Sequence, residues 1–292
     1  MRVPDRGLAL LVAVPFACGF AAAPAPARAE VAFTFADPAI VESSGLALTD
    51  GLVATVNDSG DAGRVFAVDP ATGRTVGLTS WAGEPTDVEA VATAGPGEVW
   101  VGDIGDNQAA RDAVTVLRVP LGRGERTVEP ERFELVYPDG PTDAESLLVD
   151  PSGRLVVVSK GLLGGTVYRA PARLDPDRPN RLEALGPALP IATDGAFLPD
   201  GRHLVVRNYG SASVLTWPAL ETVGSFDLPE QEQGEGLAVE GDDRLLLSTE
   251  GAFTDVLRVR LPRAVREAIA PPPSAPSSVS YTHLTLPTNR EV

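Results

Sequence analysis

Short apolar runs alternate with turn signals along most of the chain. Five segments share one phrase, in which an acidic or polar residue precedes a small apolar run: 44–47, 89–92, 145–148, 194–197 and 235–238. Each is followed by a turn rich in Gly, Pro or Asp, then by a β-branched or leucine-rich run, a polar glycine loop and a third apolar run. Short runs joined by tight turns predict antiparallel β-hairpins. The pattern therefore predicts a repeated β-sheet unit.

The spacing of the repeats predicts how these units assemble. They begin 41 to 56 residues apart, close to the length of a four-stranded propeller blade. The fifth repeat lacks a fourth strand of its own, and the apolar run 32–35 near the other end of the chain can supply it. We expect an all-β fold, a β-propeller of five four-stranded blades closed by the N-terminal strand, because closure removes exposed sheet edges.

Two other architectures stay open. A sixth, degenerate blade fits in the long gap between residues 90 and 146, and an open β-sandwich would use similar strands. No run with a helical period occurs in residues 30–260, which argues against an α/β fold.

The N-terminal segment differs from the repeats. Arg2 and Arg6 precede an apolar run at 8–23, and Ala27 and Ala29 supply the small residues of a cleavage site. This pattern predicts a secretory signal peptide over 1–29. We therefore expect a secreted protein or one at the extracellular cell surface.

The C-terminal segment also departs from the repeat pattern. The propeller is expected over residues 30–262, and residues 263–280 indicate a short helix followed by a Pro/Ser-rich linker. Residues 281–292 have the composition of a sequence artefact or a disordered tail. A membrane or cell-wall anchor beyond the linker stays an open alternative.

Charge and residue types exclude several kinds of chemistry. The 292-residue chain has 40 acidic and 24 basic residues, a net charge of −16, which repels nucleic acid. Its one cysteine, Cys18, lies in the predicted signal peptide, so the expected domain has no disulfide. His203 is the one histidine within the repeats, and it follows a turn at the far end of its blade. That position argues against a Ser-His-Asp triad.

Polar residues gather where the first strand of each repeat begins. In an antiparallel meander, the start of the first strand and the loop after the second lie at the same end of the sheet. In ring order this end carries Glu42, Ser43 and Ser44 with 57–61, Asp87 and Glu89 with 103–107, Asp143 and Glu145 with Lys160, Asp194 with 207–210, and Glu235 with Glu250. The candidate ligand-binding residues among them are Asn57, Asn107, Asp194, Asn208, Tyr209 and Glu250.

So many carboxylates on one rim need a counter-charge. Two unit charges about 4 Å apart repel by roughly 4 kcal/mol at an effective dielectric near 20. Lys160 and Arg207 come from the same set of loops, and a metal ion is the remaining partner. Without Cys or His the ligands are oxygens, which favours Ca²⁺ or Mg²⁺ over Zn²⁺. A structural interpretation stays open, because Asp or Asn before Gly often stabilises its own turn.

Several phrases resemble those of a known family. ESSGLA, NDSGD, GDIGDN, DAESLLVD and QGEGLAV, found between residues 42 and 239, resemble the phrases of exported bacterial β-propellers. More distantly, the chain resembles β-propeller phytases and their esterase-like relatives, which have six blades where this sequence predicts five. The phytase resemblance implies Ca²⁺ on Asp58, Glu89, Asp103, Asp106, Glu145 and Glu235, with Lys160 and Arg207 receiving phosphate.

Three functions are consistent with these observations. The first is an exported propeller that binds a ligand or partner at an acidic face occupied by Ca²⁺. The second is a Ca²⁺-dependent phosphoesterase, in which Glu89 activates water while Lys160 and Arg207 offset developing charge. The third is a structural scaffold whose carboxylates only brace the blades. We expect a monomer whose partner is a small molecule, a phosphorylated compound or a protein.

Overall fold

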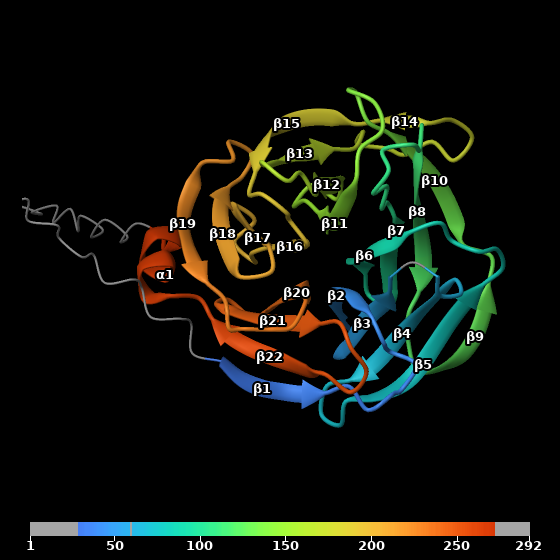
Figure 1. Cartoon of the computed structure of the whole chain (residues 1–292), viewed down its shortest axis with the longest axis horizontal. Coiled ribbons are helices and arrows are strands. Elements are labelled where there is room, and N and C mark those ends of the chain that lie inside the picture. Colours follow the sequence, from blue (N-terminus) through green and yellow to red (C-terminus); the bar gives the residue numbers. More distant parts are fainter. Residues whose placement is uncertain (1–28, 59, 272–292) are drawn as a thin grey trace, which may run out of the picture.

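The protein folds as a ring of five antiparallel sheets around a central axis (Figure 1). The structure is a computed structural model that describes residues 29–58 and 60–271. Residues 1–28 of the predicted signal peptide (1–29), Ser59 and the tail from 272 onward lie outside the described residues. Within the described part of the chain, no helix has the length and apolarity needed to cross a membrane.

The strands follow the predicted meander from the axis outward. Blade one holds β2 (Ser43–Thr49), β3 (Leu52–Asn57), β4 (Arg64–Asp69) and β5 (Arg74–Trp81), and blade two holds β6 (Val88–Gly95), β7 (Glu98–Asp103), β8 (Val114–Pro120) and β10 (Glu131–Val136). Blade three holds β11 (Ala144–Val149), β12 (Leu155–Ser159), β13 (Gly165–Arg169) and β15 (Glu183–Ala188). Blade four holds β16 (Asp194–Phe197), β17 (His203–Arg207), β18 (Ser211–Thr216) and β19 (Thr222–Asp227).

Blade five closes the ring with a strand from the N-terminal end. It holds β20 (Gly234–Glu240), β21 (Arg244–Thr249) and β22 (Asp255–Arg260), and its outer strand is β1 (Ala29–Thr34), which pairs antiparallel with β22. The five-bladed propeller and its closure are thus confirmed. The strand begins three residues earlier than the apolar run 32–35, because backbone pairing continues through the polar residue Glu30.

Two strands were not predicted. β9 (Gly124–Val128) pairs in parallel with β5 of blade one, and β14 (Asn180–Arg181) pairs in parallel with β10 of blade two. β9 lies between β8 and β10 of blade two, and β14 lies between β13 and β15 of blade three. Each therefore runs back to the preceding blade and adds a strand to its outer edge. β9 occupies the long gap where a sixth blade was an alternative, and that alternative is wrong.

The apolar core consists of five clusters, one between each pair of adjacent blades. The cluster between blades five and one shows the arrangement, since Phe33 and Val256 of blade five lie in the same cluster as Leu46 and Phe66 of blade one. The other four clusters join blades one and two, two and three, three and four, and four and five. Each blade is therefore buried on both faces by its neighbours.

Two glycines bring the inner strands close to one another. A Cβ on Gly45 of β2 would lie 2.8 Å from the Val91 backbone nitrogen of β6. A Cβ on Gly236 of β20 would lie 2.9 Å from Leu46 of β2. Since real Cβ atoms do not approach this closely, glycine at these positions allows blades five, one and two to meet at a narrow axis.

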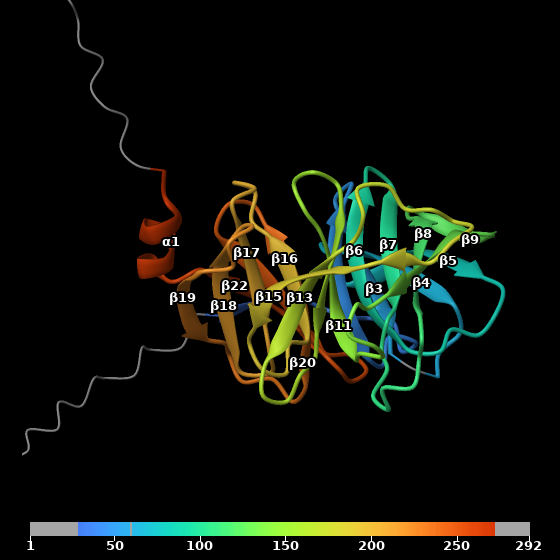
Figure 2. The same cartoon turned by 90° about the horizontal axis from the view of Figure 1, so that it is seen from above.

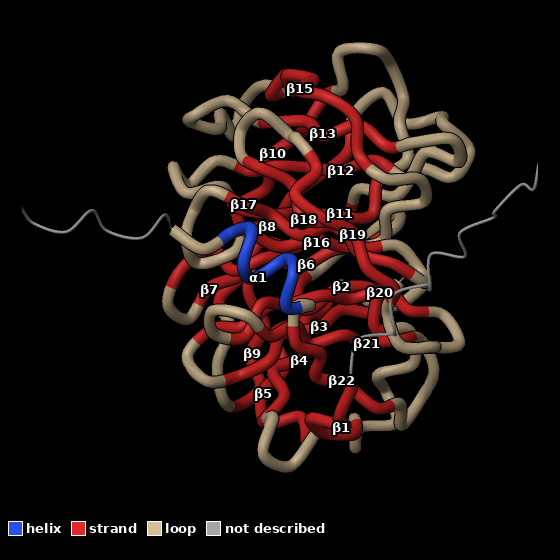
Figure 3. The backbone as a smooth tube through the Cα atoms, turned by 90° about the vertical axis from the view of Figure 1, so that its left-hand side faces the viewer, coloured by secondary structure: helices blue, strands red, loops and turns tan. Residues whose placement is uncertain are grey.

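One helix lies outside the ring. α1 (Arg263–Ile269) follows β22 and packs its buried Val265 against blade four, where a Cβ on Gly224 of β19 would lie 3.1 Å from Val265. Seen from the side, α1 stands at one end of the molecule beside β19 (Figure 2). Figure 3 looks at this end and shows α1 in front of the strands.

Removing the apolar contact of the closing strand should destabilise the whole ring. Phe33 of β1 is 7% exposed and packs edge-to-face on Phe35 at 5.5 Å. We expect Phe33→Ala to cost about 3–5 kcal/mol and to lower the melting temperature by about 6–20 °C for a domain of this size. Val31→Ala in the same strand is the control, because Val31 is 55% exposed. Equal melting temperatures for the two variants, measured by circular dichroism, would contradict the role assigned to β1.

Candidate functional site

The inner strands of four blades carry a β-bulge where they begin. Pairing with the second strand shifts between Ser43 and Gly45 in β2, and the same shift occurs at the start of β6, β11 and β20. A bulge adds an unpaired residue and re-aims its side chain. The bulged residues include Ser44, Glu89, Glu145 and Glu235. Three glutamates from three blades are thereby set at the same end of the axis, which we call the top face.

These glutamates form a buried acidic site with their neighbours. We define the acidic well as Asp58, Asp87, Glu89, Glu145, Lys160, Tyr209 and Glu235. Glu89, Glu145 and Glu235 are each 5% exposed or less, whereas Asp58, Asp87 and Lys160 are half-buried. Burial of several carboxylates at one place is unusual unless they share protons or cations.

Burial and mutual repulsion raise the pKa values of the acids in the well. Burial, followed by the charges of Glu145, Asp58 and Asp87, raises the pKa of Glu89 to about 11. Burial and the nearby Glu235 raise the pKa of Glu145 to about 8. Burial raises the pKa of Glu235 to about 7, and burial with the charge of Asp58 raises that of Asp87 to about 6. The well therefore holds protons at neutral pH unless a cation replaces them.

Lys160 is the basic group inside the well. Its ammonium donates to Oε1 of Glu145 and lies 5.7 Å from the centre of the Tyr209 ring. Burial lowers the pKa of Lys160, but the charge and hydrogen bond of Glu145, together with the charges of Tyr209 and Glu235, outweigh that effect and the pKa is raised. The other oxygen of Glu145, Oε2, is buried and has no hydrogen-bond partner. One ammonium thus leaves part of the buried acid without a partner.

Three carboxylates in the well have the geometry of a cation site. One oxygen from each of Asp58, Asp87 and Glu89 lies within 4.8 Å of the other two. The loop beside them contains Gly105, where a Cβ would lie 2.4 Å from Asp87 and 2.8 Å from Glu89. Any other residue at position 105 would press on these carboxylates. The donor set is all oxygen, which fits Ca²⁺ or Mg²⁺.

Two predicted metal ligands have other partners. Asp103 accepts hydrogen bonds from the backbone N–H groups of Thr86 and Asp87 and forms an ion pair with Arg111 at 2.9 Å. Asp106 accepts from the backbone N–H groups of Ala110 and Arg111, each at 2.9 Å. Both carboxylates hold the loop after β7 in shape, and neither belongs to the cluster of Asp58, Asp87 and Glu89.

Arg207, predicted to receive phosphate, is fully buried. Its guanidinium donates to the backbone carbonyls of Asn208, Gly236 and Ser248 and to the side chain of Gln231. An arginine with 0% exposure and donors directed at backbone oxygens cannot contact a ligand on the surface. We therefore correct its role to tying β17 of blade four to β20 and β21 of blade five.

Asp194, predicted to bind ligand, also braces the ring. β16 has no bulge at its start, and Asp194 is 1% exposed. Its carboxylate accepts from the backbone N–H groups of Leu237 at 2.6 Å and Leu46 at 3.4 Å, in two other blades. Burial raises its pKa well above the usual range. The structural interpretation left open for the inner-strand acids holds for Asp194.

The remaining predicted ligand-binding residues divide between turns and the rim. Asn57 is buried and accepts from the backbone of Val41 and Glu42, and Asn208 stabilises its own turn through Ser211. Asn107 is exposed in the loop after β7. Glu250 is half-buried on the rim, where Gln233 donates to it and burial with the charges of Asp58 and Glu42 raises its pKa.

Two residues of the site were missed as candidates. Asp87 was placed on the top face but not chosen as a ligand, although the spacing of Asp87 and Glu89 puts both at one bulge. Arg111 was missed because it follows the acidic loop by several residues and nothing in its local sequence marks it. It reaches back to donate to the Gly105 carbonyl at 2.7 Å.

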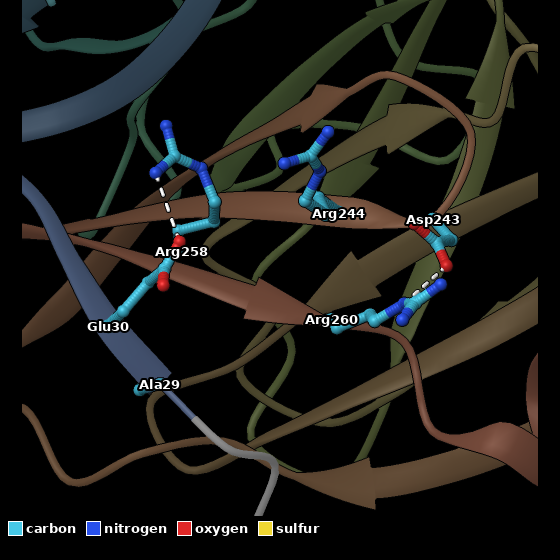
Figure 4. Close-up of a pocket in the computed structure, with 6 residues that line it drawn as sticks. All are labelled: Ala29, Glu30, Asp243, Arg244, Arg258 and Arg260. Carbon is cyan, nitrogen blue, oxygen red and sulfur yellow. Dashed lines mark hydrogen bonds and ion pairs between the residues drawn. The ribbon is translucent and has the colours of Figure 1, made fainter.

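A surface cavity among the described residues lies away from the acidic well. It has a volume of about 710 Å³ and lies on the outer strands of blade five, beside β1. Figure 4 shows its arginines, with Arg258 paired to Glu30 and Arg260 paired to Asp243. Since Glu240 also pairs with Arg258, most of the positive charge here is neutralised within the protein. We assign this surface no ligand.

Comparisons with known proteins assign no family to the chain. No protein-family model and no curated protein matches the chain. A gluconolactonase from Xanthomonas campestris is 15% identical, with 75% of this chain and 72% of that chain covered and a TM-score of 0.47. A PQQ-bound aldose sugar dehydrogenase from Streptomyces coelicolor is 13% identical, with 82% and 99% covered and a TM-score of 0.45. The comparisons give no link to phytases.

The metal-free protein should lose stability as the pH rises from about 4.5 to about 8. Glu145 has a usual value of 4.5 and a folded pKa of about 8, so in this range the folded state binds more protons than the unfolded state. The resulting stability is complete below pH 4.5 and is lost as the pH passes the folded pKa. One pKa unit on one buried carboxyl is worth about 1.4 kcal/mol, or about 3 °C in melting temperature.

Thermal melts in EDTA between pH 4.5 and 8.5 measure this effect. Glu145→Gln, which is neutral throughout, should flatten the decline. Glu129→Gln is the control, because Glu129 is exposed in the connection between β9 and β10. A melting temperature that rises between pH 5 and 8 would show that these carboxylates do not hold protons in the folded protein.

Proposed function

We propose that the protein binds a ligand or partner at its top face, with a Ca²⁺ ion held by Asp58, Asp87 and Glu89. The observation that carries this proposal is the convergence of three carboxylates from two blades within 4.8 Å. In the described part of the chain, no ion pair includes Asp87 or Glu89. A divalent cation is the simplest way to offset charges at this separation, since hard cations prefer clustered carboxylates.

Two further features support a cation at this place. Glu145 Oε2 is buried without a hydrogen-bond partner, and Glu145 is the strongest charged influence on Glu89. A buried acceptor without a partner costs free energy that a bound cation would recover. Gly105 keeps the space beside Asp87 and Glu89 free of a side chain. The residues present therefore fit a hard cation, which would supply positive charge for an oxygen-bearing ligand.

Export remains part of the proposal. A signal peptide would direct the protein outside the cell, where Ca²⁺ is abundant enough for sites with dissociation constants of about 10⁻⁴ to 10⁻³ M. Of the two alternatives, the phosphoesterase loses one of its two basic groups, because Arg207 is buried against backbone carbonyls. We therefore favour binding over phosphate-ester hydrolysis.

Calcium should stabilise the protein in a saturable way. At a concentration 100 times the dissociation constant, we expect about 2.7 kcal/mol of added stability, or about 5–10 °C in melting temperature. Isothermal titration calorimetry on the EDTA-treated protein gives the affinity directly. Glu89→Gln and Asp87→Asn should each weaken binding at least about tenfold, because each removes a charged ligand from a hard-cation site.

A carboxylate outside the top face provides the control for the Ca²⁺ titration. Glu129→Gln removes one carboxylate outside the top face and should leave the Ca²⁺ affinity unchanged. If neither heat of binding nor a shift in melting temperature appears at several millimolar Ca²⁺, the carboxylates only brace the blades and the structural scaffold is the better account.

A further inference from the structure

Lys160 occupies the acidic well as a cation supplied by the chain itself. It is the only lysine in the sequence and stands directly after β12, where its backbone N–H donates to the Asp143 carbonyl at 2.9 Å. Its side chain is 22% exposed, whereas that of its partner Glu145 is 4% exposed. The ammonium therefore enters the well from the solvent side and meets a carboxylate that is almost completely buried.

Glu145 stands between Lys160 and the cation site. One of its oxygens accepts from Lys160, and the other is buried without a partner. Glu145 and Glu89 occupy equivalent bulges at the start of β11 and β6, two inner strands that pack against each other, and the charge of Glu145 acts on Glu89. Glu145 is thus the group through which the ammonium and a metal ion at Asp58, Asp87 and Glu89 would affect each other.

We infer that Lys160 is a built-in competitor of the metal ion, and that the two cations compete for the carboxylate of Glu145. This inference rests on the proposed Ca²⁺ site. Without metal, Lys160 neutralises Glu145 and limits repulsion in the well. With metal bound, Glu145 turns its charge toward the divalent ion, and its bond to Lys160 weakens.

The well can hold the displaced ammonium without expelling it. Tyr209 lies 5.7 Å from the Lys160 nitrogen, and an aromatic face attracts an ammonium group. Glu235 also acts on Lys160 through its charge. Metal binding would therefore move the ammonium from Glu145 toward Tyr209 and Glu235. Lys160 then sets how tightly the metal binds, because every binding event must first weaken the Lys160–Glu145 pair.

The test is a double-mutant cycle measured by calorimetry. Lys160→Met keeps most of the length of the side chain and removes its charge. It should tighten Ca²⁺ binding at least about tenfold, or about 1.4 kcal/mol, because the metal no longer has to weaken the Lys160–Glu145 pair. Lys160→Arg should bind Ca²⁺ within about threefold of the wild type. Glu145→Gln should weaken binding, and adding Lys160→Met to it should change the affinity less than about threefold, because the shared carboxylate is gone.

Controls separate competition from other effects. Arg118→Met removes a basic group paired with Glu98 on the outer part of blade two and should leave the affinity unchanged. Lys160→Gln is a second neutral variant if Lys160→Met melts below the wild type in EDTA. Calorimetry at matched ionic strength avoids differences in screening between the proteins.

The measured Ca²⁺ affinities decide whether Lys160 competes with the metal for Glu145. Unchanged or weaker Ca²⁺ binding in Lys160→Met overturns it while leaving the proposed function standing. If Lys160→Met tightens Ca²⁺ binding by the same factor in the wild type and in Glu145→Gln, then Lys160 acts directly on the three carboxylates. That result also overturns the inference. Absence of binding in both proteins removes the proposed function and the inference together.

Discussion

The packing of each blade between two neighbours is the constraint on which the rest of the structure depends. All five apolar clusters lie between adjacent blades, so a sheet with one neighbour missing would expose half of its core residues. β1 completes blade five and covers the edge of β22, which joins the two ends of the described chain. The inner strands are consequently fixed relative to one another, and Gly45 and Gly236 allow them to meet closely at the axis.

The acidic well results from a local departure within this regular packing. A bulge at the start of β6, β11 and β20 directs Glu89, Glu145 and Glu235 toward one another instead of along the blade faces. Gathering buried carboxylates works against stability, because desolvation and repulsion both raise their pKa values. The rigid ring holds these groups in a geometry that they would not adopt alone, as is common at binding sites.

The polar residues of the top face have two roles, and the contacts of each side chain show which role it has. Asp194, Arg207 and Asn57 face backbone groups of neighbouring strands and satisfy them, so they stabilise the ring. Asp87 and Glu89 face one another and Asp58, with no basic group in an ion pair with either among the described residues. Lys160 combines features of both sets, since it neutralises Glu145 while its side chain stays partly exposed to solvent. One internal cation therefore neutralises only part of the acidic charge in the well.

The sequence by itself determined the five repeats, the closing strand and the end of each blade on which the acids gather, because turn residues and apolar runs act over short distances along the chain. It did not predict β9 and β14, whose residues are mostly polar and pair with a different blade. It also placed Asp194 and Glu89 at the same position on the top face, since both begin the same repeated phrase. Only the tertiary structure decided between them, because a bulge turns Glu89 toward other carboxylates, whereas Asp194 reaches amide groups of β2 and β20.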